Sequence, residues 1–170
     1  NSLSVKLDKA NEDRFKLTYN ANRFMNGSSY LTNEVRAYAS TGNQEHFDNY
    51  WNEVNNLKNR DKGVAAMQEI GITQEEEKMI EEMSALSNHL VPLEEKAMED
   101  VEKGKMQEAL DYVYGDEYNA SIAKINSLKE AFLADLDTRT LAEIETLGRD
   151  VKHIQTTMFV VLIVVGIIQL

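Results

Sequence analysis

The residues best suited to chemistry in this sequence form a polar stripe within its first forty positions. The stripe repeats at intervals of three and four residues, which places its members on one face of a helix: Tyr19, Asn22, Asn26, Ser29, Asn33, Arg36 and Ser40. Amides and hydroxyls donate and accept hydrogen bonds without a counter-charge, unlike the lysines and glutamates of an ordinary solvated face. The pattern predicts contact with another helix or with a polar small molecule, and an Asn-rich solvated face is the alternative.

Arg36 is the single cation of this stripe and lies about one turn before Thr41-Gly42. A guanidinium holds a carboxylate through two parallel hydrogen bonds, and neighbouring amides and a phenol would orient that ligand. The last helix is expected to pass the same level. The predicted ligand-binding residues are therefore Asn33, Arg36, Tyr118, Asn119 and Ile122. The alternative is that Arg36 forms a salt bridge with Glu34, Glu45 or Asp116.

Other patterns argue against catalysis, metal binding and nucleic-acid binding. The histidines, His46, His89 and His153, lack the Glu-x-x-His and His-x-x-x-His spacings of metal sites. The sequence has no cysteine, no Gly-rich phosphate loop and no serine elbow. Its net charge of −11 opposes binding to a phosphate backbone. We therefore predict that the chain is not an enzyme, holds no metal or cofactor, and binds no nucleic acid.

The elements that position these residues are predicted to be helices, since one proline and eight glycines are few for 170 residues. A heptad seam over residues 3–38 predicts a first helix that ends near Gly42. A second helix, capped by Asn43, is expected to end at Gly71. Arg14 interrupts the apolar seam, and it is expected to snorkel or to pair with an acid on a neighbouring helix.

A capping box of Thr73 and Glu76 predicts the start of a third helix, which Pro92 should kink and Gly104 should end. A short helical segment follows. A fourth helix is expected to run from Asp116 without a break into the apolar C-terminal run. Together these patterns predict an all-α fold, an antiparallel up-down-up-down four-helix bundle whose first and last helices are the longest and whose last helix enters the membrane.

The last fifteen residues, 156–170, contain no charged side chain and are mostly aliphatic. A helix of that length rises about 22 Å, less than the hydrocarbon core of about 30 Å. We therefore interpret the run as the truncated start of a membrane-spanning helix, with residues 1–155 forming one domain outside the membrane. A buried core helix is the alternative.

Two segments read as connections between helices. The first is Asn33-Glu34-Val35-Arg36-Ala37-Tyr38 with Thr41-Gly42, and the second extends from Gly104-Lys105 through Glu108-Ala109-Leu110 to Tyr114-Gly115-Asp116-Glu117-Tyr118. Both resemble the four-helix-bundle sensor domains of bacterial methyl-accepting chemotaxis proteins and of related transmembrane receptors. The first is similar to the turn between helices one and two in that family, and the second to the connection between helices three and four.

The resemblance implies an extracytoplasmic module at the bacterial inner membrane, flanked by two membrane helices, the first of which would precede Asn1. It implies small-molecule binding near the membrane-distal end and a cytoplasmic signalling domain after the second span. It also implies a homodimer along the first helix, with an interface formed by Tyr19, Asn22, Asn26 and Ser29. First-helix arginines hold a ligand carboxylate in several members. Only Arg36 corresponds here, which speaks against an amino acid and leaves a mono-acid or an uncharged ligand open.

The expected function is chemoreception, in which ligand binding shifts the last helix and carries the signal across the membrane. One alternative is the sensor of a histidine kinase or a diguanylate cyclase. The other is a membrane-anchored helical bundle with a structural or partner-binding role.

Overall fold

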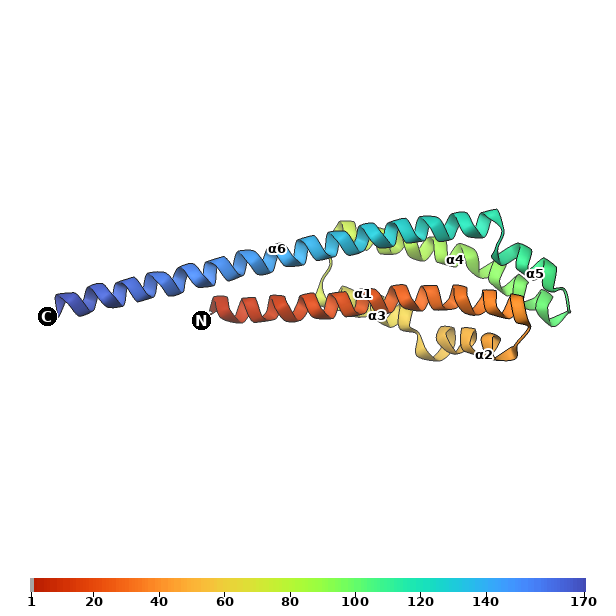
Figure 1. Ribbon diagram of the computed structural model, residues 1–170, viewed down its shortest axis with the longest axis horizontal. Coiled ribbons are helices and arrows are strands. Elements are labelled where there is room, and N and C mark those ends of the chain that lie inside the picture. The colour runs from red at the N-terminus through yellow and green to blue at the C-terminus, as the bar shows by residue number, and fades with distance from the viewer. Residues whose placement is uncertain (1) are drawn as a thin grey trace.

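The computed structural model describes residues 2–170, and every regular element in that range is helical. The elements in chain order are α1 (Ser2–Thr41), α2 (Gln44–Asn52), the π-helical segment η1 (Glu53–Leu57), α3 (Asn59–Ile70), α4 (Gln74–Glu102), α5 (Met106–Val113) and α6 (Asp116–Ile168). The predicted all-α class is confirmed (Figure 1).

The turn after α1 forms as predicted. The Gly42 N–H donates to the Tyr38 carbonyl over 2.8 Å, and Gly42 has a φ of 68°, a left-handed conformation that glycine adopts without strain. Asn43 then caps α2 by accepting a hydrogen bond from the Glu45 N–H at 3.0 Å. The end of α1 is therefore fixed locally, and Arg36 lies about one turn before it.

The prediction of a single second helix is wrong, because residues 44–70 form three helical segments. α2 continues into η1, which ends at Leu57 and is followed by Lys58 with a φ of 51°. The Glu53 carboxylate accepts the Asn59 backbone N–H at 2.8 Å and the Asn59 side-chain amide at 2.9 Å. Glu53 therefore satisfies groups at the start of α3 that the interrupted backbone ladder leaves free.

The start of α4 confirms the predicted capping box. Thr73 Oγ1 accepts the Glu76 N–H at 3.1 Å, and the Glu76 carboxylate accepts the Thr73 N–H at 3.2 Å. α4 continues through Pro92, whose ring leaves the Asn88 carbonyl without its usual helical donor. The kink expected at Pro92 remains a prediction. α6 is unbroken over 53 residues, as expected.

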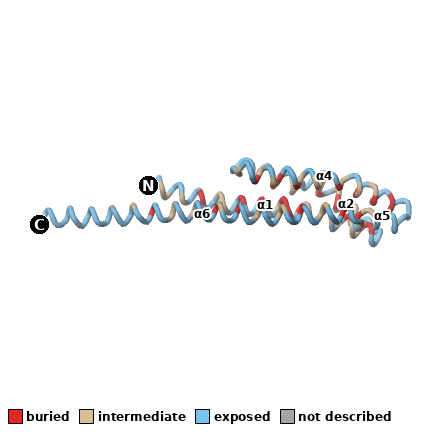
Figure 2. Tube along the Cα trace, turned by 90° about the horizontal axis from the view of Figure 1, so that it is seen from above, coloured by how far each residue is buried: buried red, intermediate tan, exposed pale blue. Residues whose placement is uncertain are grey.

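The helices lie side by side and share two hydrophobic clusters. α1 packs against α3 and α6, and α4 packs against α5 and α6 (Figure 1). One cluster contains Val35, Tyr50 and Tyr118, and the other contains Leu17 and Phe132. Figure 2 shows buried residues along the helices that are paired, whereas the last part of α6 is exposed. The sites described below lie where these helices meet.

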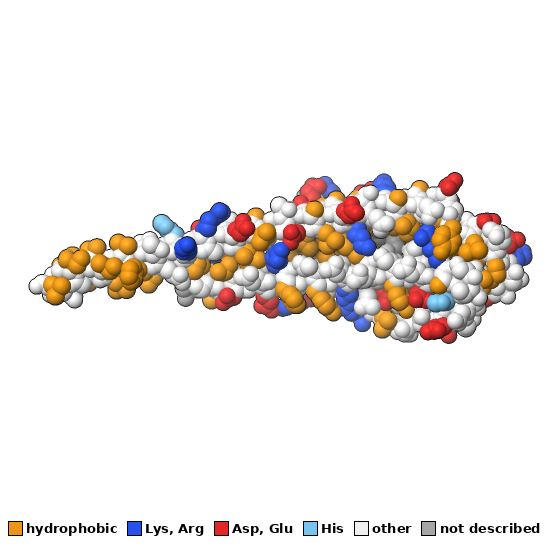
Figure 3. All heavy atoms as spheres, in the orientation of Figure 1, with side chains coloured by type: hydrophobic (Ala, Val, Ile, Leu, Met, Phe, Trp, Pro, Cys, Tyr) orange, Lys and Arg blue, Asp and Glu red, His pale blue; other side chains and the backbone are white. Residues whose placement is uncertain are grey.

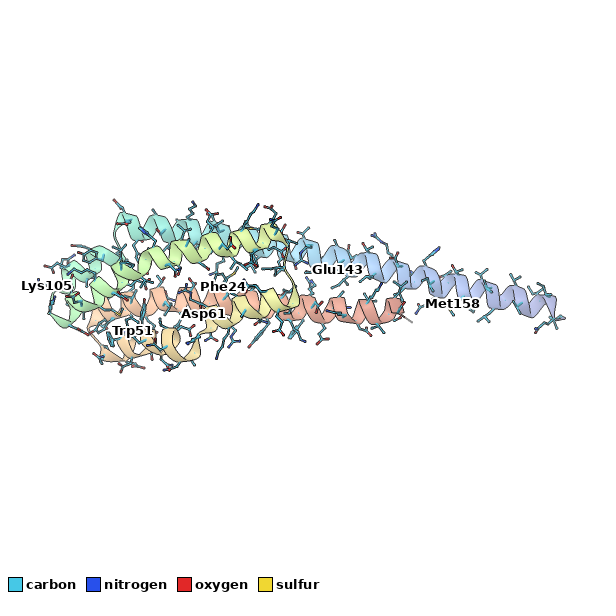
Figure 4. All side chains as sticks on the ribbon, turned by 180° about the vertical axis from the view of Figure 1, so that it is seen from behind. Phe24, Trp51, Asp61, Lys105, Glu143 and Met158 are labelled. Carbon is cyan, nitrogen blue, oxygen red and sulfur yellow. The ribbon has the colours of Figure 1, made fainter. Side chains whose placement is uncertain are left out.

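α1 and α3 approach each other closely because Gly63 has no side chain. A Cβ at Gly63 would lie 2.7 Å from the Asn20 carbonyl oxygen and 2.9 Å from the Phe24 backbone nitrogen. Figure 4 shows Phe24 between the packed helices. Neither backbone atom can move without shifting a helix, so Gly63→Ala should lower the free energy of unfolding by about 1–3 kcal/mol, measured by urea titration.

The control for this substitution is Gly148→Ala, since a Cβ at Gly148 would meet no atom within 4 Å. Alanine in an open helical position should raise the free energy of unfolding by about 0.5–1 kcal/mol. If both substitutions had the same sign, the close approach of α1 and α3 would not be the determinant.

The C-terminal part of α6 is apolar and exposed. Met158 is 60% exposed and Leu162 is 68% exposed, and hydrophobic side chains cover this part of the surface (Figure 3). Met158 marks its beginning in Figure 4, beyond the N-terminal start of α1. By length and composition, α6 contains a segment able to cross a membrane.

Candidate functional site

Arg36 joins α1 to the turn between α5 and α6. Its Nε donates to the Val113 carbonyl and its Nη2 donates to Asn119 Oδ1, both over 2.8 Å. The guanidinium carbon lies 4.5 Å from the ring centroid of Tyr114 and 5.1 Å from that of Tyr118. These contacts combine hydrogen bonds with cation–π attraction, and they fix the guanidinium at the edge of the helix pair.

The alternative partners of Arg36 are wrong, because within residues 2–170 Arg36 forms no ion pair with Glu34, Glu45 or Asp116. The Glu34 carboxylate instead lies 2.7 Å from His46 Nδ1. The guanidinium is therefore held by a carbonyl, an amide and two aromatic faces and keeps its full positive charge. None of these groups carries a full negative charge.

Tyr118 and Asn119 contact Arg36 from α6. We call the contacts of Arg36 with Val113, Tyr114, Tyr118 and Asn119 the clasp. Tyr118 is fully buried, and its hydroxyl donates to Thr32 Oγ1 at 3.2 Å. Burial raises the pKa of the Tyr118 phenol far above its ordinary value, so the ring stays neutral. Asn119 Nδ2 donates to the Tyr114 carbonyl at 2.8 Å. Both predicted ligand-binding residues thus position Arg36.

A cavity of about 180 Å³ lies next to this clasp, between α1, α4 and α6. Its apolar wall comes from both hydrophobic clusters and from the residue Ile122 beside them: Phe24, Met25, Met83, Ile122 and Ile125. Its polar wall consists of hydroxyls and amides: Ser28, Ser29, Thr32, Asn33, Ser87 and Asn126. An engineered cavity of about 150 Å³ holds benzene, so this volume suits a ligand with a similar number of heavy atoms.

Two cations complete the lining of the cavity. Arg36 comes from α1 and Lys129 comes from α6, and the Lys129 ammonium donates to Ser29 Oγ at 3.1 Å. No carboxylate lines this cavity, and within residues 2–170 neither cation belongs to an ion pair. The cavity is therefore electropositive, and an anion that entered it would displace no competing acid.

No family model, curated protein or solved structure matches this chain. Its chemistry is consequently inferred from the residues alone. Across the described part of the chain, no group of three His, Asp or Glu side chains converges in a way that could hold a metal ion.

Only some of the predicted ligand-binding residues share the cavity. Asn33, Arg36 and Ile122 line it, whereas Tyr118 and Asn119 support Arg36 from outside. Ser29, expected at a dimer interface, also lines the cavity and contacts Lys129. The other three expected interface residues, Tyr19, Asn22 and Asn26, lie along a separate groove. The homodimer remains a prediction.

Lys129 is the residue that sequence reasoning missed. It lies seven residues after Ile122 and four after Ile125, so the helical repeat places all three on one face of α6. A lysine on a long charged helix reads as a solvent-facing residue, however, and nothing in the local pattern connects it with Ser29. The seven-residue spacing from Ile122, a predicted ligand-binding residue, was the sequence signal that could have identified Lys129.

Proposed function

We propose that this chain is the extracytoplasmic sensing module of a bacterial transmembrane chemoreceptor and that its ligand is a small organic anion. The cavity between α1, α4 and α6 supports this proposal, because it combines an apolar wall with two cations that form no ion pair within residues 2–170. Such a site selects a molecule with one acidic group and a small hydrophobic body. No step of bond-making chemistry is required, and the module is not an enzyme.

The proposed ligand pose follows from the position of the charges. The ligand carboxylate lies at the Lys129 end, where it accepts hydrogen bonds from the ammonium and from the Ser29 hydroxyl. The apolar part of the ligand packs against Ile122 and Met83. Arg36 keeps donors that its contacts with Val113 and Asn119 do not use. The ligand thereby adds contacts between α1 and α6.

Signal transmission is proposed to run through α6. This helix carries Lys129 at the cavity and continues without a break into the exposed apolar segment. Ligand binding that favours one packing of α1 against α6 would displace the far end of α6 by about 1–2 Å, the scale of helix shifts in receptors and allosteric proteins. The proposed location is the bacterial inner membrane, with residues 1–155 outside the cytoplasm.

The proposed arrangement is an antiparallel up-down-up-down four-helix bundle. Its four members are α1, the interrupted α2–α3 segment, α4 and α6, with α5 in the last connection. The pairing of α1 with α3 and α6, and of α4 with α6, supports this topology. It places both the start of α1 and the apolar end of α6 toward the membrane.

The test is a calorimetric titration of the full chain in lipid nanodiscs with propionate, lactate and benzoate. At least one probe should bind, and Lys129→Ala should weaken its affinity about tenfold or more through loss of a charge-assisted hydrogen bond. The matched control is Lys124→Ala on the same helix. Lys124 is exposed and pairs with Glu82 over 3.0 Å, outside the cavity.

Two results would contradict the proposed site. One is the absence of binding by any of the three acids. The other is an affinity that lacks the expected dependence on the cavity cations, either because it falls equally in Lys129→Ala and Lys124→Ala or because it is unchanged in Arg36→Ala. Arg36→Ala also removes the clasp between α1 and α6, so its affinity is compared at a temperature where the variant remains folded.

Exposed aromatic residues favour a second candidate function, a membrane-anchored bundle that binds a protein partner. Phe15 is 73% exposed and Tyr19 is 61% exposed on α1. The full-length gene separates the two functions. A membrane span before Asn1 and a signalling domain after Leu170 support a receptor, and the type of that domain distinguishes chemotaxis from kinase or cyclase output.

A further inference from the structure

A second concave surface lies on the outer side of α1, where this helix meets η1 and α3. It is an open groove of about 600 Å³, separate from the cavity described above. α1 contributes the predicted interface residues Tyr19, Asn22 and Asn26 together with Tyr30, and the opposite side contributes Glu53 and Asn59. The groove is independent of the proposed anion site, because the two share no lining residue.

The floor of the groove is held by a hydrogen-bonded network. Glu53 accepts both the backbone and the side-chain N–H groups of Asn59, and Asn59 Oδ1 accepts Arg23 Nε at 2.8 Å. A Cβ at Gly27 would lie 3.0 Å from Glu53 Oε1 and 3.1 Å from the Arg60 backbone nitrogen, so a larger residue here would force these neighbours of α1 to shift. Glu53 is the first residue of the π-helical segment η1, and these hydrogen bonds order the floor without a ligand.

The rim of the groove carries aromatic rings and amides that have few contacts within the chain. Tyr19 is 61% exposed and Tyr30 is 37% exposed, and both line the groove. Asn22 and Asn26 lie between them and are exposed. Tyrosine offers a large rigid face at low entropic cost, and asparagine offers one donor group and one acceptor group.

The charges of this groove cancel, in contrast to those of the cavity. Arg23 and Glu53 are its charged residues, one of each sign, and the Glu53 oxygens are engaged with Asn59. An ionic ligand gains little from such a surface. A neutral molecule with many hydroxyls gains hydrogen bonds to the amides and apolar contact between its C–H groups and the tyrosine rings.

We propose that the groove binds a neutral sugar. Tyr19 and Tyr30 are eleven residues apart, which is about 16 Å along a helix, so the groove accommodates a saccharide longer than one ring. The sugar rings lie against the two tyrosines, and the hydroxyls bond to Asn22, Asn26 and Asn59. The competing occupant is a second copy of this chain, packed along the same stripe of α1.

The experiment uses the full chain in lipid nanodiscs, which avoids detergents with sugar head groups. Glucose, maltose and myo-inositol are titrated and followed by saturation-transfer NMR, and the oligomeric state is measured by light scattering with and without each sugar. At least maltose should bind, and Tyr19→Ala should weaken its affinity about tenfold. Phe15→Ala is the matched control, since Phe15 is an exposed aromatic on the same helix that does not line the groove.

Three results would overturn the proposal. The first is no saturable binding of any of the three sugars at tens of millimolar. The second is equal weakening in Tyr19→Ala and Phe15→Ala. The third is a stable dimer that Tyr19→Ala dissociates and that no sugar perturbs, which would assign the groove to a second copy. Asn22→Ala provides an independent variant, since Asn22 is exposed and its truncation leaves the core intact.

Discussion

Replacing Arg139 with alanine should lower the free energy of unfolding by about 3–5 kcal/mol, because it leaves a buried carboxylate without its partner. Glu76 is fully buried at the start of α4. Arg139 Nη2 donates to Glu76 Oε1 at 2.7 Å, and Arg139 Nε donates to Glu76 Oε2 at 2.8 Å. This paired geometry joins α4 to α6 and is the strong form of the arginine–carboxylate interaction.

Burial alone would raise the pKa of Glu76, and the hydrogen bonds from Arg139 and from the Thr73 N–H reverse that effect and hold it below its ordinary value. Without Arg139 the carboxyl should therefore bind a proton more readily. The loss of stability in Arg139→Ala should accordingly be larger at neutral pH than at acidic pH. Urea titrations of the nanodisc-embedded chain at about pH 4 and about pH 7, followed by circular dichroism, measure both effects.

The control is Arg14→Ala, which removes another ion pair to α6. Arg14 Nη2 donates to Asp137 Oδ1 at 2.6 Å, which confirms the expected acidic partner, but the two side chains are 36% and 63% exposed. Exposed pairs contribute about 0.2–1 kcal/mol. Similar losses in Arg14→Ala and Arg139→Ala would show that burial of Glu76 is not the source of the effect.

The second large effect is a fall in stability as the pH rises from about 4.5 to about 7, centred on Glu94. Burial raises the pKa of this carboxyl from 4.5 to about 7, against a hydrogen bond from Tyr50 and the charge of Arg60. A raised folded-state pKa means that the protonated form stabilises the fold. That contribution is complete below the unfolded pKa and is lost as the pH rises through the folded value, with an upper limit of about 3 kcal/mol.

The position of Glu94 explains why its ionised form is poorly accommodated. Glu94 is 5% exposed on α4, and its Oε2 has no hydrogen-bond partner within the described residues. Tyr50 from α2, Arg60 from α3 and Tyr118 from α6 face it. Arg60 is too weakly coupled to neutralise it, and its own Nε is buried without a partner.

Glu94→Gln should flatten the fall in stability between about pH 4.5 and about pH 7, since an amide stays neutral over that range. Glu95→Gln, on the exposed neighbour, should leave the fall unchanged. The fluorescence of Trp51, the single tryptophan, provides the readout because its ring packs against Tyr50 at 5.1 Å. An unchanged slope in Glu94→Gln would assign the pH dependence to other groups.

The helices were predictable from local signals, and the sites were predictable only in part. The heptad seam follows α1 along its length, and the Asn43 cap and the Thr73–Glu76 capping box act within one turn of the chain, so these residues fix the starts of α2 and α4. The break at Lys58 carries no glycine or proline. It depends on the Glu53 carboxylate reaching Asn59, a contact that the hydrophobic pattern does not encode.

The candidate cavity shows the same limit. Arg36 was found because it is the single cation on a neutral stripe, whereas Lys129 sits among many charged residues on α6. The hydrogen bond between Lys129 and Ser29 joins positions 100 residues apart. Such a pair depends on how α1 and α6 are rotated about their axes, and sequence periodicity fixes that rotation only to within a broad face.

Because of Pro92, α4 and α6, which face each other across the cavity, differ in their backbone hydrogen bonding. The carbonyl of Asn88 lacks a helical donor, and it lies one residue after Ser87, which lines the cavity. α4 therefore lacks one backbone hydrogen bond at this point, whereas α6 is an unbroken helix on the opposite side. A molecule that wedged between the two helices would therefore bend α4 more readily than α6, and the displacement of α6 would extend along its unbroken length to the exposed apolar segment.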